Sequence, residues 1–455
     1  MQRFSYSILF SLLFCVFIGM LPFSKGVAAA AYVLLVVLSG CKLLLKNRFF
    51  QTPEVEQVAL TRIYAKNSKS SKRILIAPLF LFSALLLSLL YTSNQQVGVR
   101  LLISQSKMLG ISFIFFVNAG LVLKKKEYYL LFFLRATSLA ALITVLFFLL
   151  PSTSVAAIAA AITPLKDYII HEKAYAFGAY SPFLDRLQFS YLLSGSFFLA
   201  LWRLLKLPNK FRCFSDYIYI LAPCACLLIL GARGAQLGFI LGNSIWLIGI
   251  YSYYGHRVIK DKFGNIFSYG IIAVGLFLTT CCLPFLIYKS IPAVKMRYDQ
   301  LSWEINTFQN NTYKNYDYIY FTSTRRFLSW RNSWQLIQQQ PLLGVGIGDY
   351  EAEMKIVYQQ DKLGFPVNTH SQLLYYWTCA GVLGIGLFLL IWGYWLYCLL
   401  RTKDYWLRIL AYSFFAFYTF VFLFDAPLNF QVGAMAFWFF YAFVGLLGYF
   451  KIKTT

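Results

Sequence analysis

Residues 371–399 read SQLLYYWTCAGVLGIGLFLLIWGYWLYCL and contain no charged side chain. About 20 mostly apolar residues in a helix are enough to cross the roughly 30 Å hydrocarbon core of a bilayer. This stretch therefore predicts a transmembrane helix, and the same pattern recurs along the chain. Together with it we expect about twelve spans, in an all-α, polytopic membrane protein. The other predicted spans are 6–23, 27–45, 74–91, 97–123, 129–150, 183–205, 215–231, 234–254, 266–288, 407–424 and 430–450.

The composition agrees with this fold class. Hydrophobic residues make up 59% of the 455 residues, charged residues make up 13%, and the mean hydropathy is +0.62. Soluble domains have roughly 45–50% apolar and about 25% charged residues, so a soluble multidomain protein is excluded. The nine cysteines lie in or beside predicted spans, and their spacing matches no metal site. We therefore expect neither a disulfide framework nor a metal.

The net charge of +24, from 41 basic and 17 acidic residues, would ordinarily suggest a nucleic-acid partner. The basic residues instead gather in every second connection between spans, for example at 46–73, 124–126, 203–212, 257–262 and 401–408. By the positive-inside rule these connections and both termini are cytoplasmic. The charge is thus mostly a topology signal, and we expect no nucleic-acid partner.

One outward connection is long. It divides the chain into a first part, 1–288, with nine spans, an outward loop domain, 289–370, with short helices, and a last part, 371–455, with three spans. The loop domain is the only sizeable polar segment. Functional residues are therefore expected there and at the membrane face beside it.

Two charged residues are predicted at this outward face. Arg233 lies 21 residues after Arg212 and 24 before Arg257, and either interval covers about 30 Å as a helix. Asp425 lies in the same way between the last two spans. A snorkelling arginine and a simple turn aspartate are the alternatives to a functional role.

The outward loop contains a predicted helix at 325–340, RRFLSWRNSWQLIQQQ, which follows possible capping residues at 323–324 and stops at Pro341. At about 100° per residue, one face carries apolar side chains and Arg326 and Arg331 flank it. The helix could lie on the membrane or on the helix bundle. Alternatively, one or both guanidinium groups bind phosphate. The apolar face is formed by Phe327, Trp330, Trp334 and Ile337.

A glycine-rich segment, 341–349 or PLLGVGIGD, follows and leads into another predicted helix that Asp349 would cap. Its spacing is not that of a dinucleotide-binding motif. We expect a turn, with backbone amides facing an anion as the alternative. His370 then stands at the start of the tenth span. The positive end of the helix dipole disfavours imidazolium, so a neutral general base is predicted, with a purely structural histidine as the alternative.

These residues come from distant parts of the sequence, yet the topology places all of them at one membrane face. An arginine cluster with a neutral base beside the bilayer suits chemistry on a lipid-linked phosphate or diphosphate. The arginines would stabilise the departing anion, and the histidine would take a proton from an attacking hydroxyl group.

Three motifs resemble those of the O-antigen ligase and O-antigen polymerase superfamily. Residues 231–235, GARGA, resemble its Ser-Arg-Gly element, with Ala232 in place of serine. RFLSW at 326–330 followed by PLLGVG at 341–346 resembles its Arg-x3-Trp and Pro-Leu-x-Gly-x-Gly elements. HSQLL at 370–374 followed by GVLG at 381–384 resembles its His-Asn-x-x-Leu and Gly-x-Leu-Gly elements, with serine where asparagine is usual.

The resemblance implies a bacterial inner-membrane glycosyltransferase of the C-type superclass, which acts at the periplasmic face on undecaprenyl-diphosphate-linked glycans. It implies an inverting transfer that needs no metal or other cofactor. Arg233 and Arg326 would contact the diphosphate and His370 would be the catalytic base. Arg331 is a third arginine without a firm counterpart, and Trp330 and Asp425 are possible supporting residues.

The function predicted on this basis is an O-antigen ligase, which joins a polysaccharide to a lipid A–core sugar in a bilayer whose lipids are its surroundings. A repeat-unit polymerase and a protein O-oligosaccharyltransferase are alternatives of the same chemical class. A transporter or flippase for lipid-linked glycans is the alternative from another class, although its site would be expected near the bilayer midplane.

Overall fold

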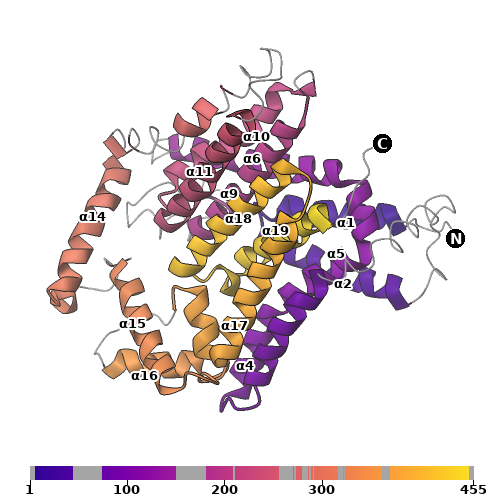
Figure 1. Ribbon diagram of the computed structural model, residues 1–455. Helices are drawn as coiled ribbons and strands as arrows, with labels where there is room; N and C mark the ends of the chain where they lie inside the picture. The colour runs from indigo at the N-terminus through magenta and orange to yellow at the C-terminus, as the bar shows by residue number, and fades with distance from the viewer. Residues whose placement is uncertain are drawn as a thin grey trace, which may run out of the picture. The chain divides into compact units, whose positions relative to one another are not determined.

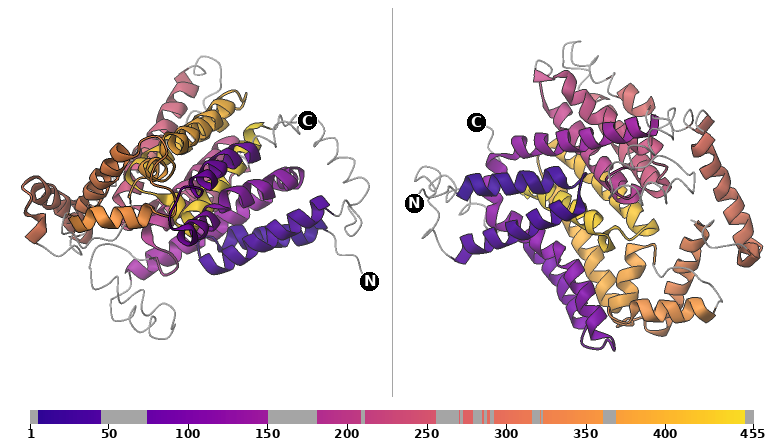
Figure 2. Two further views of the ribbon diagram at one scale, coloured as in Figure 1. Left: turned by 90° about the horizontal axis from the view of Figure 1, so that it is seen from below. Right: turned by 180° about the vertical axis from the view of Figure 1, so that it is seen from behind.

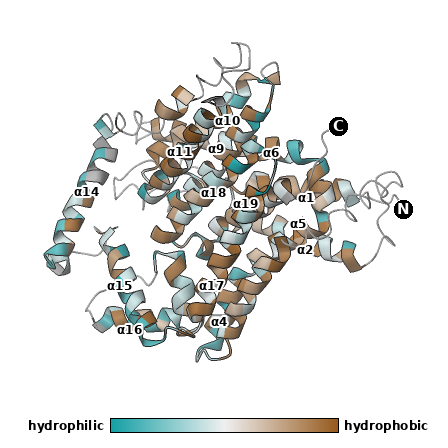
Figure 3. Cartoon of the chain, viewed as in Figure 1, coloured by the Kyte–Doolittle hydropathy of each residue, from teal (hydrophilic) through white to brown (hydrophobic). Residues whose placement is uncertain are grey.

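A computed structural model describes residues 6–44, 74–149, 181–208, 211–255, 292–315, 323–360 and 369–449, with the short run 273–278 and single or paired positions at 270, 285, 288–289 and 321. The described residues form helices and turns and no strand (Figure 1). Apolar residues dominate the long helices, whereas polar residues are frequent on α14, α15 and α16 (Figure 3). The prediction of an all-α membrane protein is therefore confirmed.

Seven helical stretches in the described residues are long and apolar enough to cross a membrane, judged by length and composition. Three shorter apolar helices, α1 (Tyr6–Met20), Ile74–Ser88 and α10 (Phe214–Ile229), coincide with further predicted spans. The predicted span 266–288 lies largely outside the described residues, so the number of twelve stays a prediction. The seven stretches are α2 (Lys25–Leu44), α4 with α5 (Gln95–Gln105 and Lys107–Lys124), α6 (Lys126–Leu149), α11 (Arg233–Gly255), α17 (Gln372–Leu400), α18 (Tyr405–Phe424) and α19 (Gln431–Tyr449).

The described chain forms two compact units. The first comprises residues 1–133, 317–403 and 422–455. In it α19 packs on α5 and α17, α5 packs on α2, and α2 packs on α1 (Figure 2). Stacked and edge-to-face aromatic rings fill its interior, where Phe439 contacts Phe14, Phe115 and Phe133. Such rings bury large apolar areas in preferred geometries, so they fix how these helices pack.

The second unit comprises residues 134–316 and 404–421. Helix α9 (Arg186–Lys206) packs on α10 and α11 there, and Phe198 contacts the rings of Phe239, Phe414 and Phe417. The predicted outward loop is divided between the units. It gives α14 (Pro292–Gln309) to the second, and α15 (Ser323–Gln339) and α16 (Tyr350–Gln360) to the first. The predicted three-part division follows membrane topology rather than compactness and stays a prediction.

Helix α17 is interrupted at Ala380 and Gly381, where φ is −134° and +61°. The glycine-rich loop fits against this interruption. The amide of Val345 donates to the carbonyl of Thr378 at 2.8 Å, and the amide of Gly346 donates to that of Cys379 at 3.1 Å. These two amides are therefore bonded to protein and do not face an anion. The glycine-rich loop at 341–346 and the GVLG segment at 381–384 are therefore packed against each other and joined by backbone hydrogen bonds.

Asp349 stands just before α16, as predicted, but its side chain does not cap that helix. The carboxylate accepts the amides of Ser93 at 2.5 Å and Asn94 at 2.8 Å, at the entry to α4. The prediction that the Asp349 side chain caps α16 is thus wrong, because its hydrogen bonds go to the residues before α4. A carboxylate bonded to two backbone amides is a strong link, so Asp349 ties the loop to another helix of the same unit.

Gly381 offers a direct test of the loop-and-kink arrangement. A Cβ atom at this position would overlap the carbonyl oxygen of Leu342, and its positive φ disfavours every other residue. We expect Gly381→Ala to destabilise the protein by more than about 1 kcal/mol, seen as a lower midpoint of thermal unfolding in detergent. Gly393→Ala on the same helix is the matched control, because nothing lies within 4 Å of its Cβ position. Equal midpoints for the two variants would contradict the arrangement.

Candidate active site

Helix α15 carries the first group of site residues, and the structure corrects its predicted face. The helix covers Ser323–Gln339, close to the prediction. Of the four predicted apolar residues only Ile337 is buried, and Trp334 is 47% exposed. The buried face instead includes small polar residues, among them Ser329 and Ser333. Leu328, Leu336 and Ile337 supply the apolar part of this face, and hydrogen bonds hold its polar part, because Ser329 Oγ donates to the carbonyl of Thr369.

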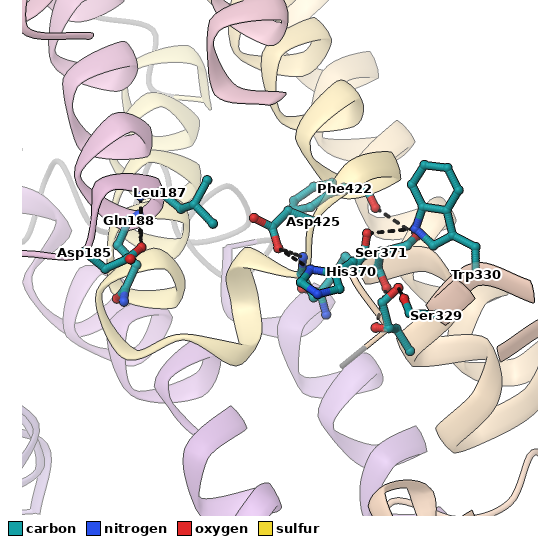
Figure 4. A network of polar contacts seen from close by, with 12 residues as sticks. Asp185, Leu187, Gln188, Ser329, Trp330, His370, Ser371, Phe422 and Asp425 are labelled. Atoms are coloured by element: carbon teal, nitrogen blue, oxygen red, sulfur yellow. Dashed lines mark hydrogen bonds and ion pairs between the residues drawn. The ribbon is translucent and has the colours of Figure 1, made fainter. Parts of the chain in front are cut away.

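Trp330 connects α15 to the start of α17. Its indole Nε1 donates to the carbonyl of His370 at 3.0 Å, and its ring centroid lies 5.4 Å from that of Phe424 and 5.6 Å from that of Phe327. A buried indole usually finds such a partner for its N–H group. Trp330 therefore holds the backbone on which His370 stands (Figure 4).

His370 has a backbone conformation that its neighbours impose. Its φ is +47°, a left-handed value that is uncommon for residues other than glycine, although asparagine, aspartate and histidine adopt it more often than the others. The carbonyls of Thr369 and His370 are bonded by α15, and the next residue, Ser371, caps α17 by accepting the amide of Leu374 at 3.4 Å. Ser371 Oγ also donates to the carbonyl of Phe422 at 3.1 Å. A strained residue held in this way points to function.

Asp425 faces this histidine. Its side chain is 6% exposed, and its Oδ1 atom lies 4.0 Å from Nδ1 of His370 (Figure 4). The same oxygen accepts the amide of Ala426 at 2.8 Å, just after the end of α18. Asp425 is therefore a turn residue whose carboxylate also lies beside the histidine ring.

The environment keeps His370 neutral. Burial lowers its pKa to about 4, and the positive charges of Arg326 and Arg325 act in the same direction, while Asp425 opposes them. A neutral imidazole at pH 7 is what a general base requires. The predicted protonation state thus agrees with the structure, although burial and two arginines cause it. Sequence reasoning overlooked Arg325. Its position directly before Arg326 was the feature that could have indicated a role beside it.

The three predicted arginines have different surroundings. Arg326 is half-buried near His370. Arg331 is exposed, and its Nε donates to Oδ1 of the neighbouring Asn332 at 3.2 Å. Arg233 begins α11 in the second unit, where its Nη2 lies 3.9 Å from Oε1 of Glu304 on α14. Sequence reasoning also overlooked Glu304, which no nearby motif marks.

The burial of Arg233 bears on the alternative that this residue is an arginine snorkelling to the lipid headgroups. Its side chain is 11% exposed and that of Glu304 is fully buried. An arginine that snorkels to lipid headgroups keeps its charged end in water, so the snorkelling interpretation fits this environment poorly. Arg326, Trp330, His370 and Asp425 lie together in the first unit, and Arg233 lies in the second.

Gln372 clamps the turn that carries Asp425. Gln372 is fully buried. Its backbone amide donates to the carbonyl of Asp425 at 3.0 Å, and its side-chain Oε1 accepts the backbone amide of Leu428 at 2.9 Å. From α4, Gln105 Nε2 donates to Oδ1 of Asn429 at 3.1 Å. The start of α17, the turn after α18 and the end of α4 are thereby joined. This clamp sets the separation of His370 and Asp425.

We expect Gln372→Leu to disturb the clamp, since the buried amide of Leu428 would lose its acceptor. Leaving such a group unsatisfied costs about 1–3 kcal/mol, so the thermal midpoint should fall by several degrees. Thermal unfolding in detergent measures this. Gln335→Leu, at an exposed position of α15, is the control and should leave the midpoint unchanged. A similar midpoint for both variants would show that the clamp contributes nothing.

The charged groups of the site can hold an anion and move a proton. Within the described residues, no three histidine, cysteine, aspartate or glutamate side chains come together as metal ligands would. The half-buried Arg325 and Arg326 provide donors in the planar arrangement that suits phosphate oxygens. The histidine and aspartate form a pair of the kind that activates a hydroxyl nucleophile.

Fold and site together define a helical membrane protein with a histidine–aspartate pair and arginines at the end of a span. Residues 218–389 match the family described as O-antigen ligase, a stretch that contains all three motifs. This match, which covers less than half of the chain, supports the O-antigen ligase superfamily, whose members are glycosyltransferase-like ligases and polymerases. No curated protein matches the chain significantly. Asp425 lies beyond the matched stretch.

Proposed function

We propose that this protein is an O-antigen ligase in a bacterial inner membrane, with both termini cytoplasmic and the site periplasmic. It would transfer a polysaccharide from undecaprenyl diphosphate to a lipid A–core sugar. The observation that carries this proposal is a neutral, strained His370 with Asp425 at Nδ1 and two arginines near it. The family match supports the class of substrate, a lipid-linked glycan.

The proton transfer follows from the ring orientation. A proton on Nδ1 would face the Asp425 carboxylate, which leaves Nε2 with its lone pair as the base. The acceptor hydroxyl gives its proton to Nε2 while its oxygen bonds to the anomeric carbon of the donor. The bond between that carbon and the phosphate oxygen breaks, and undecaprenyl diphosphate leaves. Direct displacement inverts the configuration at the anomeric carbon.

The arginines would stabilise the departing diphosphate. Its negative charge increases as the glycosidic bond breaks, and fixed donors aimed at that charge lower the barrier. We assign this role to Arg326 and Arg233, with Arg331 as the third candidate. Trp330 supports His370 through its backbone carbonyl. The charge stabilisation comes from guanidinium groups, so the proposed reaction uses no metal or other cofactor.

Two experiments test this function. Purified protein in nanodiscs, given lipid-linked glycan and a lipid A–core acceptor, is expected to form the joined product. A deletion strain is expected to lack attached O-antigen and to accumulate long lipid-linked polymer. Core carrying a single repeat unit would instead identify the alternative, a repeat-unit polymerase. Transfer onto a protein acceptor would identify an O-oligosaccharyltransferase, and lipid flipping without transfer would identify a flippase.

A further inference from the structure

Leu342 and Leu343 form an exposed apolar tip on the loop that fits against the kink of α17. Their side chains are 72% and 63% exposed. The backbone beneath them is rigidly held, because the carbonyl of Pro341 accepts the amide of Val382 at 3.1 Å and the indole Nε1 of Trp377 at 3.2 Å. Two adjacent leucines on a rigid, exposed loop form an apolar surface that is typical of contact with a lipid or protein partner.

Helix α17 gives the position of this tip along the membrane normal. From Gly381 to Leu400 the helix has 20 residues, which cover about 30 Å, the thickness of the hydrocarbon core. Arg401 caps the far end and belongs to a basic connection at the opposite membrane face. The kink, and with it the loop, therefore lies at the hydrocarbon boundary.

The surroundings of the tip match a membrane boundary. Val382 and Leu383 of α17 are 48% and 49% exposed and continue the apolar surface into the span. On the other side, the rings of Trp334 and Trp377 meet edge to face with centroids 5.6 Å apart. Tryptophan is enriched where hydrocarbon meets headgroups, because its ring is apolar and its N–H group is polar.

We infer that Leu342 and Leu343 insert into the acyl chains of the adjacent lipid leaflet and anchor the loop in the bilayer. This anchor is separate from the alternative that helix α15 lies on the membrane by its apolar face, of which Ile337 is buried and Trp334 is exposed. The anchor acts through a short loop that is bonded to α17. It does not depend on which glycan reaction the protein performs.

The anchor has a consequence for the site. The loop follows α15 directly, and α15 holds His370 through Ser329 and Trp330. An anchored loop would keep this helix at headgroup level. A lipid-linked substrate could then present its phosphate groups without leaving the bilayer.

Spin labels test the proposal. Cys41 and Cys213, the half-buried and exposed cysteines among the described residues, are replaced by serine, and single cysteines are introduced at Leu343 or Gln335. A label at Leu390, 69% exposed in the middle of α17, gives the reference for lipid. In nanodiscs of phosphatidylethanolamine and phosphatidylglycerol, relaxation of each label by oxygen and by a water-soluble nickel chelate is compared.

We expect the label at Leu343 to resemble that at Leu390, with oxygen relaxing it several-fold more effectively than nickel. The label at Gln335 should show the reverse. Greater access of nickel at position 343 would place the tip in water and overturn the proposal. Low access of both reagents would indicate a protein contact, such as a second copy, and would overturn it equally. Leu342→Cys provides an independent second label site if Leu343→Cys fails to fold.

Discussion

Replacing His370 by asparagine is expected to reduce glycan transfer by about 10²–10⁴-fold, the usual contribution of a general base. Asparagine is a better replacement than alanine because it tolerates the left-handed conformation, φ +47°, that this position requires. The variant should therefore keep the fold and lose only the base. Transfer is measured with purified protein, lipid-linked glycan and acceptor.

The pH dependence of transfer separates a catalytic from a structural histidine. With a pKa of about 4 in the free enzyme, His370 stays neutral, and kcat/KM should remain level from pH 8 down to about 5. An unperturbed histidine base, with a pKa near 6.5, would lose half its activity at about pH 6.5 and more than nine-tenths of it at about pH 5. Asp425 raises the pKa, so Asp425→Asn should move the acid limb to lower pH while lowering the rate.

Stability should follow the same titration. Between about pH 6.5 and pH 4 the unfolded chain binds a proton at His370 that the folded chain does not. The free energy of unfolding therefore decreases as the pH falls through this window, and His370→Asn should remove that part of the decrease. Full transfer activity in His370→Asn, with unchanged thermal midpoints, would exclude the proposed base.

The outline of the fold could be predicted from sequence, because hydrophobic spans follow from composition alone. Details that depend on the third dimension could not. The interruption of α17 at Gly381 falls within an unbroken apolar stretch, and only the loop from Pro341 explains it. Likewise the buried face of α15 contains Ser329 and Ser333 beside Leu328 and Leu336, and the partner of Ser329 is the carbonyl of Thr369, 40 residues away.

The candidate site was predictable in part. His370 and Asp425 stand out as polar residues at the ends of spans, and the structure brings them within 4.0 Å. Gln372 and Arg325 did not stand out, since a glutamine at a helix start and a second arginine are ordinary in sequence. Their importance depends on partners more than 40 residues away, such as Leu428 for Gln372 and His370 for Arg325.

Arg326 and Arg331 form a natural pair for the second large prediction, because they lie on one helix in different surroundings. We expect Arg326→Ala to lower kcat/KM by about 10²–10³-fold, the cost of removing one donor to a developing anion. Arg326→Lys should recover only part of this loss, since lysine keeps the charge but lacks the planar pair of donors. Arg331→Ala should cost less, because its side chain is exposed.

The acid limb of the pH profile tests whether Arg326 acts beside the base. Its positive charge lowers the pKa of His370, so Arg326→Ala should move the limb to higher pH, and Arg326→Lys should leave it nearly in place. An acid limb at unchanged pH in Arg326→Ala would show that the charge of Arg326 does not affect the pKa of His370. A loss in Arg331→Ala as large as that in Arg326→Ala would assign the diphosphate to the exposed edge of α15 as well. Of the two arginines on α15, a clearly larger loss for Arg326, together with a shifted acid limb, fits an anion held against the general base.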